Sequence, residues 1–181
     1  MLKTSTPILF RVAIIAILLT LGSLVHAQTV GVRPGIGFYT DAVGFEGLLE
    51  GRFDLPFFEE GPGQITASAF LGYSYVSVDE ASKSGVMLGA GTGYEFRFDP
   101  DAIYFKPGLI VGAEFSEFQD VAVESNAAVM LFPYVEGGYE FDFNLSVGLQ
   151  AGLKNLIYTG EGGAAERSIS LGPVVHYTFG E

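Results

Sequence analysis

Charged side chains keep to one face of the alternating segments in this sequence. In residues 43–54, Phe45, Leu49 and Phe53 fall on one side, and Glu46, Glu50, Arg52 and Asp54 fall on the other. A two-residue period predicts a β-strand with one apolar and one polar face, because successive side chains of a strand point to opposite sides. Such strands are stable in a closed sheet, in which each face meets a single environment.

Eight segments show this alternation, and polar, Gly-rich or Pro-rich connections separate them. The predicted strands are residues 29–39, 43–54, 64–77, 85–98, 102–116, 126–141, 143–155 and 167–179. No segment has a sustained period of 3.6 residues. The sequence therefore predicts an all-β chain whose eight antiparallel strands follow one another up and down around a barrel.

The connections differ in length. "DPDA" and "FDFN" predict tight turns at one rim, and the acidic segments 79–84, 117–125 and 157–166 predict longer loops at the other. The connection around residues 55–63 is long for a tight turn. Four prolines fall inside predicted strands, where each removes a ladder hydrogen bond, so we expect bulges there. They are Pro34, Pro107, Pro133 and Pro173.

The first 27 residues have the pattern of a cleaved secretory signal peptide. Lys3 and Arg11 flank the start of an apolar run over residues 12–21, and Val25 and Ala27 provide small residues for cleavage. Residues 28–181 then form one domain, with seven basic against 21 acidic residues and a charge of 7 − 21 = −14. This charge argues against nucleic acid as a partner. The chain has no cysteine, which excludes disulfides and thiolate metal sites.

Two closed structures fit the pattern, and they differ in the face that points inward. A soluble, periplasmic, lipocalin-like barrel has its apolar face inside and binds a small apolar ligand, whereas a transmembrane barrel turns that face to lipid. Most strand glycines fall on the polar face, and small residues suit the concave side of a narrow barrel. The transmembrane barrel is thus the favoured interpretation, and the lipocalin-like barrel remains the alternative.

An eight-stranded barrel is narrow enough for its side chains to fill it. We therefore expect a charge network that plugs the interior and a structural or surface-interaction role. The expected members are Arg33, Glu46, Glu50, Arg52, Glu95, Arg97, Lys106, Glu114, Glu136, Lys154 and His176. A narrow channel for an apolar molecule is the competing hypothesis, since apolar side chains also fall on this face at one level: Met87, Ile110, Met130, Phe132 and Val174.

A Tyr-x-Phe phrase recurs at three strand ends, in "GYEF" at 93–96, "GYEF" at 138–141 and "HYTF" at 176–179. In an up-and-down barrel, the fourth, sixth and eighth strands end at the same rim. Aromatic rings collect in girdles where a barrel meets the membrane surface. We predict a periplasmic aromatic girdle of Tyr94, Phe96, Tyr139, Phe141, Tyr177 and Phe179.

The residues do not predict an enzyme, a cofactor or a metal site. His176 is the only histidine of the mature chain, and Ser170 lies six residues away along the same strand, about 20 Å at the usual rise. A catalytic triad needs these groups in hydrogen-bond contact, although a serine on a neighbouring strand remains open. The acidic residues Asp79, Glu80, Glu117, Asp120 and Glu124 lack the spacing of a calcium loop.

The signal peptide, the alternating strands, the "GYEF" phrases and the closing "VVHYTF" resemble the small eight-stranded outer-membrane proteins of diderm bacteria, the opacity-type and OmpX-like family. The resemblance implies residence in the outer membrane, contact with its lipid and a possible surface partner bound through loops. It also implies recognition of a C-terminal aromatic residue by the outer-membrane insertion machinery. In this chain, Gly180 and Glu181 follow Phe179.

Overall fold

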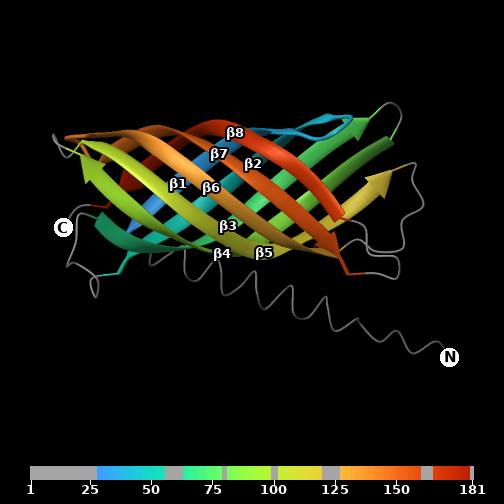
Figure 1. The fold of residues 1–181 in the computed structure, drawn as a ribbon, viewed down its shortest axis with the longest axis horizontal. Coiled ribbons are helices and arrows are strands. Elements are labelled where there is room, and N and C mark those ends of the chain that lie inside the picture. Colours follow the sequence, from blue (N-terminus) through green and yellow to red (C-terminus); the bar gives the residue numbers. More distant parts are fainter. Residues whose placement is uncertain are drawn as a thin grey trace.

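The computed structural model describes residues 28–55, 63–78, 81–98, 102–119, 127–159 and 165–179. Eight strands close into a barrel in chain order, and Figure 1 shows them crossing it at a slant. They are β1 (Thr29–Phe38), β2 (Val43–Asp54), β3 (Gly63–Val78), β4 (Ala81–Phe98), β5 (Ile103–Gln119), β6 (Ala127–Phe141), β7 (Leu145–Tyr158) and β8 (Ala165–Thr178). The prediction of eight strands is confirmed, whereas the predicted signal peptide lies outside the described residues.

All neighbouring strands are antiparallel, and the pairing of β1 with β8 closes the barrel. The closing register places Thr29 beside Thr178, so the start of β1 and the end of β8 share one rim, called the terminal rim below. The opposite rim is called the far rim. At the terminal rim, Asn144 has a φ of 62° in the turn between β6 and β7, a left-handed conformation that asparagine tolerates well.

Several strands extend further toward the far rim than the sequence predicts. β4 begins at Ala81, inside the predicted loop 79–84, and β5 continues to Gln119. β7 and β8 likewise reach Tyr158 and Ala165, inside the predicted loop 157–166. The prediction was wrong because polar residues are typical of loops, whereas at this rim polar side chains face the barrel interior from paired strands.

The prolines interrupt single ladders without bulges. On the ladder between β1 and β8, pairing stops between Val32–Val175 and Ile36–Leu171. This leaves three residues on each strand, so no residue is inserted on either side. The ladders beside Pro107 and Pro133 have similar gaps and keep their registers. The expectation of bulges was therefore wrong. Each proline lacks the N–H for one neighbour, and its other ladder remains paired.

The two faces of the sheet meet different environments. Charged and hydroxyl side chains are buried inside, while large apolar side chains stand exposed around the outside. The exposed set includes Val32, Phe45, Leu49, Val86, Phe105, Leu109, Val111, Leu131, Val135, Leu149, Leu153, Leu171 and Val175. The lipocalin-like alternative predicted that the apolar face points inward. That prediction is wrong, because the apolar face points outward. In the described part of the chain, no helix is long and apolar enough to cross a membrane.

Candidate functional site in the barrel interior

The interior contains the charged residues that alternation assigns to it. Ten of the eleven expected members of the charge network are buried: Arg33, Glu46, Glu50, Arg52, Glu95, Lys106, Glu114, Glu136, Lys154 and His176. Arg97 differs, because its side chain is 37% exposed at the terminal rim. The ion pairs between these side chains fall into two groups, one toward each rim.

Arg33 is the centre of the group nearer the terminal rim. Its guanidinium forms an ion pair with Glu50 and lies 3.0 Å from the Glu136 carboxylate. It also donates a hydrogen bond to the side-chain oxygen of Gln150, and its Cζ atom lies 4.9 Å from the centre of the Tyr134 ring. These partners come from β2, β6 and β7, so this one side chain connects opposite walls of the barrel.

His176 and Lys106 complete the same group. The two ring nitrogens of His176 face carboxylates, with Nε2 lying 3.2 Å from Glu50 and Nδ1 lying 3.6 Å from Glu136. The Lys106 ammonium is fully buried and lies 3.4 Å from Glu136. Glu50 and Glu136 therefore each face more than one basic side chain, in keeping with the rule that buried charges are paired.

The rim part of this group is more open. Arg52 pairs with Glu95 at 3.0 Å. Arg97 pairs with Glu95 at 2.8 Å and also with Glu140 at this partly exposed end of the interior. Together the terminal-side group comprises Arg33, Glu50, Arg52, Asp54, Glu95, Arg97, Lys106, Glu136, Glu140 and His176.

The far-side group is smaller and comprises Glu46, Lys83, Glu114, Lys154 and Glu166. Lys83 lies 2.8 Å from Glu114 and 2.7 Å from Glu166. Lys154 lies 2.7 Å from Glu46, whose other oxygen accepts a hydrogen bond from Ser170. The group has two lysines and three glutamates, so neither group carries a large excess of one sign.

Apolar side chains lie between the two groups on several strands, and only beside Leu48 do members of both groups, Arg33 and Glu46, line one small described space. Along β5, the inward side chains run from Lys106 through Ile110 to Glu114, and along β2 Leu48 stands between Glu46 and Glu50. The apolar layer consists of Leu48, Phe70, Met87, Ile110, Ala128, Met130, Phe132, Tyr134 and Leu156. Four of the five residues that could have lined an apolar channel belong to this packed layer, and Val174 is also fully buried.

Interior glycines make room for rings from neighbouring strands. A methyl group at Gly31 would overlap the His176 ring, and one at Gly108 would lie 2.5 Å from the Tyr134 ring. These are cross-strand partners, so a large side chain covers the space beside each glycine. The space that remains between Arg33, Glu46, Gln150 and Ser170 is about 10 Å³, roughly room for one water molecule.

Sequence reasoning missed part of the network. Lys83 and Glu166 fall in predicted loops, and Gln150 and Tyr104 are absent from the predicted network, although Tyr104 donates a hydrogen bond to Glu136 at 3.0 Å. Lys83 shares the odd positions of Glu95 and Arg97 on β4. If the alternation of the predicted strand 85–98 had been continued two residues toward the N-terminus, it would have placed Lys83 on the inner face.

The recurring aromatic pairs lie outside the barrel at the terminal rim. The ring centres of Tyr94 and Phe96 are 4.6 Å apart, and those of Tyr139 and Phe141 are 4.9 Å apart. Tyr177 and Phe179 form a third pair at 5.4 Å. Edge-to-face contacts of this kind are favourable between aromatic rings. That this rim is periplasmic remains a prediction.

The described contacts in this interior neutralise charge and fill space. Among the described residues, no group of three histidine, cysteine or acidic side chains is arranged to hold a metal ion. The buried carboxylates are engaged with arginine, lysine, histidine, tyrosine or serine side chains. The interior thus resembles a plug made of side chains.

No family model and no curated protein matches the sequence. Solved structures that share the fold include the following two. The crystal structure of the outer membrane enzyme PagL has 22% identity and a TM-score of 0.52, over 82% of this chain and 99% of that chain. The crystal structure of Neisserial surface protein A (NspA) has 13% identity and a TM-score of 0.60, over 83% of this chain and 95% of that chain.

The chain has the fold of the small eight-stranded outer-membrane β-barrels. Its belt of exposed apolar side chains adds an independent physical argument, because such a surface is stable in lipid and not in water. The fold and this belt together indicate a transmembrane β-barrel whose outer face contacts lipid.

Proposed function

We propose that this barrel is a closed, non-conducting outer-membrane protein with a structural or surface-interaction role. The observation that carries the proposal is the apolar layer between the two ion-pair groups. An ion that crossed the barrel would have to leave water, break buried ion pairs and pass Phe70, Met130 and Phe132, each 1% exposed. Desolvating an ion without new partners is unfavourable by many kcal/mol.

A planar-bilayer recording tests this proposal. The folded mature chain is purified free of porins and is expected to give no sustained conductance. An open porin, which conducts steadily at the same voltages, is the positive control. Heat-dependent gel mobility of the same sample establishes that the barrel is folded, and recovery of the chain with floated lipid vesicles establishes that it inserts. Long-lived, large conductance steps from material that shows this mobility shift would contradict the proposal.

We also propose that the barrel is not an enzyme, although PagL, which shares its fold, is described as one. The geometry around His176 supports this. Its cross-strand partner is Ser146, which is therefore a candidate nucleophile. Both ring nitrogens, however, are directed at the carboxylates of Glu50 and Glu136. A catalytic base needs one ring nitrogen toward the hydroxyl. Hydrolysis of lipid A that a His176→Ala variant loses would overturn this.

The surface-interaction role belongs to the loops at the far rim, since recognition generally resides in loops carried by a rigid scaffold. For assembly, we propose that the insertion machinery reads the aromatic end of β8. Phe179 is exposed at the terminal rim and contacts Tyr177, so its ring is available for recognition. A Phe179→Ala variant is expected to accumulate less folded barrel in the outer membrane. Leu145→Ala, on an outer position of the same rim, serves as its control.

A further inference from the structure

Arg167 is the exception among the basic residues. The chain from residue 28 onward has seven, of which Arg33, Arg52, Lys83, Arg97, Lys106 and Lys154 point inward and take part in ion pairs. Arg167 lies on β8 between the inward Glu166 and Ser168, so alternation directs it outward, and it is exposed. No ion pair links it to any acid in the described residues.

The position of Arg167 is close to the far rim. It is the third residue of β8, and its cross-strand partner on β7 is Asn155, also on the outer face. The Asn155 amide nitrogen donates to the carbonyls of Leu131 at 3.4 Å and Leu153 at 3.1 Å, which holds this polar side chain in place. Further from the rim, the outward neighbours on β8 are Ile169 and Leu171, both exposed and apolar.

Depth explains why an arginine is tolerated there. An arginine on the lipid face of a barrel destabilises the fold by roughly 2–4 kcal/mol at the bilayer midplane and by about 0–1 kcal/mol near the membrane interface. Arg167 therefore lies near the boundary between the apolar belt and the headgroups. The anionic groups of lipids at that boundary are phosphates, which a guanidinium binds with paired hydrogen bonds.

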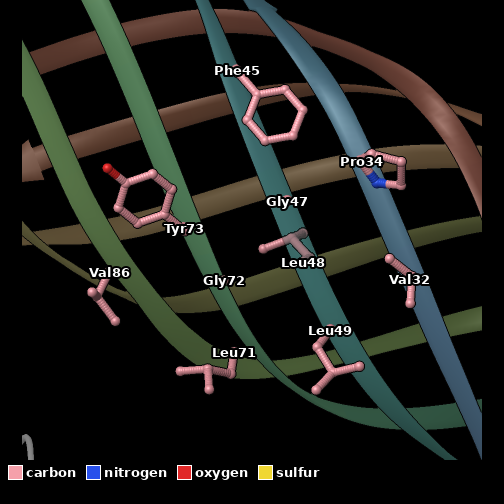
Figure 2. A pocket seen from close by; sticks show the side chains of 10 residues that line it. All are labelled: Val32, Pro34, Phe45, Gly47, Leu48, Leu49, Leu71, Gly72, Tyr73 and Val86. Carbon is pink, nitrogen blue, oxygen red and sulfur yellow. The ribbon is translucent and has the colours of Figure 1, made fainter.

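A second outer-face feature lies on the strands beside β8. An apolar groove of about 500 Å³ runs over β1 to β4, and Figure 2 shows Gly47 in it between Phe45 and Leu49. Its lining residues are Val32, Pro34, Phe45, Gly47, Leu48, Leu49, Leu71, Gly72, Tyr73 and Val86. A methyl group at Gly47 would meet nothing closer than the Phe45 ring at 3.9 Å. The missing side chain at Gly47 therefore leaves the space open.

The strand registers relate the two features. Phe45 pairs with Ile36, and Ile36 pairs with Leu171, which is four residues from Arg167 on β8. At the usual rise and strand spacing, the end of the groove at Phe45 thus lies about 13 Å along and about 10 Å across from Arg167. A lipid with a phosphate headgroup and several acyl chains covers such a span.

We propose that the outer face of β8, β1, β2 and β3 binds one phosphate-bearing acylated lipid. Arg167, beside Asn155, takes the phosphate, and the groove over Gly47 takes an acyl chain. This lipid site goes beyond the proposed closed barrel and does not depend on whether the barrel conducts. Leu48 of the interior layer borders the groove, whereas Arg167 and the exposed residues Phe45, Leu49 and Tyr73 lie on the outer face.

Native mass spectrometry of the folded mature chain tests the site. The chain is released from detergent micelles that contain phosphatidic acid or diacylglycerol with the same acyl chains, and the fraction carrying one lipid is measured. We expect phosphatidic acid to be retained over diacylglycerol. The Arg167→Gln variant should lose about tenfold in phosphatidic acid affinity, as for loss of a charge-assisted hydrogen bond, and Arg167→Lys should lose less.

The groove is tested with a matched pair of outer-face glycines. Gly47→Leu fills the groove and should lower phosphatidic acid retention several-fold. Gly137→Leu, on the outer face of β6 where the nearest atom to a methyl group is 3.7 Å away, should leave it unchanged. Because one lipid occupies both features, the double variant Arg167→Gln, Gly47→Leu should retain less phosphatidic acid than either single variant. Heat-dependent gel mobility confirms that every variant folds.

Four results would overturn the proposal. The first is equal retention of phosphatidic acid by Arg167→Gln and the unaltered chain. The second is an equal loss of retention in Gly47→Leu and Gly137→Leu. The third is displacement of the lipid by inorganic phosphate at matched concentration, which would mean that the site binds a free anion. The fourth is a dimer in the spectrum that Gly47→Leu abolishes, since the groove would then be an interface between two copies of the chain.

Discussion

The inner and outer faces of the same strands are built on different principles. On β5, Lys106, Ile110 and Glu114 are at most 2% exposed inside, while Phe105, Leu109 and Val111 are 40–46% exposed outside. Each inner side chain has particular partners on other strands, whereas the outer ones need only be apolar, because lipid fills the space around them. The free energy of unfolding should therefore depend on which side chain occupies an inner position, but only on whether the side chain at an outer position is polar or apolar.

The largest effect is expected from an interior charge. Arg33→Met leaves Glu50 and Glu136 without their main cation, and breaking a buried ion pair from one side reduces the free energy of unfolding by about 3–5 kcal/mol. The measurement is urea unfolding of the barrel in micelles. Arg97→Met, at the half-exposed rim of the same group, should have a clearly smaller effect. Equal losses for the two variants would mean that burial does not govern this network.

A charge on the outer face probes the opposite side of the comparison. Leu149 is 70% exposed on the outer face of β7, and Leu149→Arg should reduce the free energy of unfolding by roughly 2–4 kcal/mol, because a guanidinium is unfavourable in hydrocarbon. Phe143→Arg is the control, since Phe143 is also exposed but lies in the turn at the terminal rim. If both variants unfold like the parent in lipid vesicles, the outer belt does not contact lipid.

Added volume should matter inside and not outside. Gly31→Ala places a methyl group in the position of the His176 ring, and overpacking of this kind reduces stability by about 1–3 kcal/mol. Gly47→Ala adds the same methyl group on the outer face, where there is room for it. The two are compared by thermal loss of the fast-migrating form on gels. A larger effect at Gly47 would reverse the assignment of the faces.

Removed volume should give the smallest difference. Val174 is fully buried inside, and Val174→Ala removes two methyl groups that nothing replaces, which reduces stability by about 1–2 kcal/mol. Val135 faces outward, and lipid chains can fill the space that Val135→Ala leaves. Urea unfolding in micelles should separate this pair. No difference between them would mean that the interior around Val174 is loosely packed.

Much of this architecture follows from local patterns in the sequence. The period of two locates all eight strands and assigns Glu46, Lys106 and Lys154 to the interior, because alternation is a local property of a strand. Local polarity misplaces the far-rim ends of β4 and β8, and with them Lys83 and Glu166. The prediction of bulges at the prolines failed for a related reason. The absence of a backbone N–H is visible in the sequence, but whether the strand register shifts in response depends on the neighbouring strand.

The sequence alone therefore determined the strand number, the two faces and the residue types on each. Only the tertiary structure decided which charges meet. Arg33 donates to Gln150, 117 residues away, and Lys154 to Glu46, 108 residues away. Such pairs depend on strand register and on the closure of β1 against β8, and neither is encoded in the pattern of a single strand. The separation of the charges into two groups around an apolar layer has the same non-local origin.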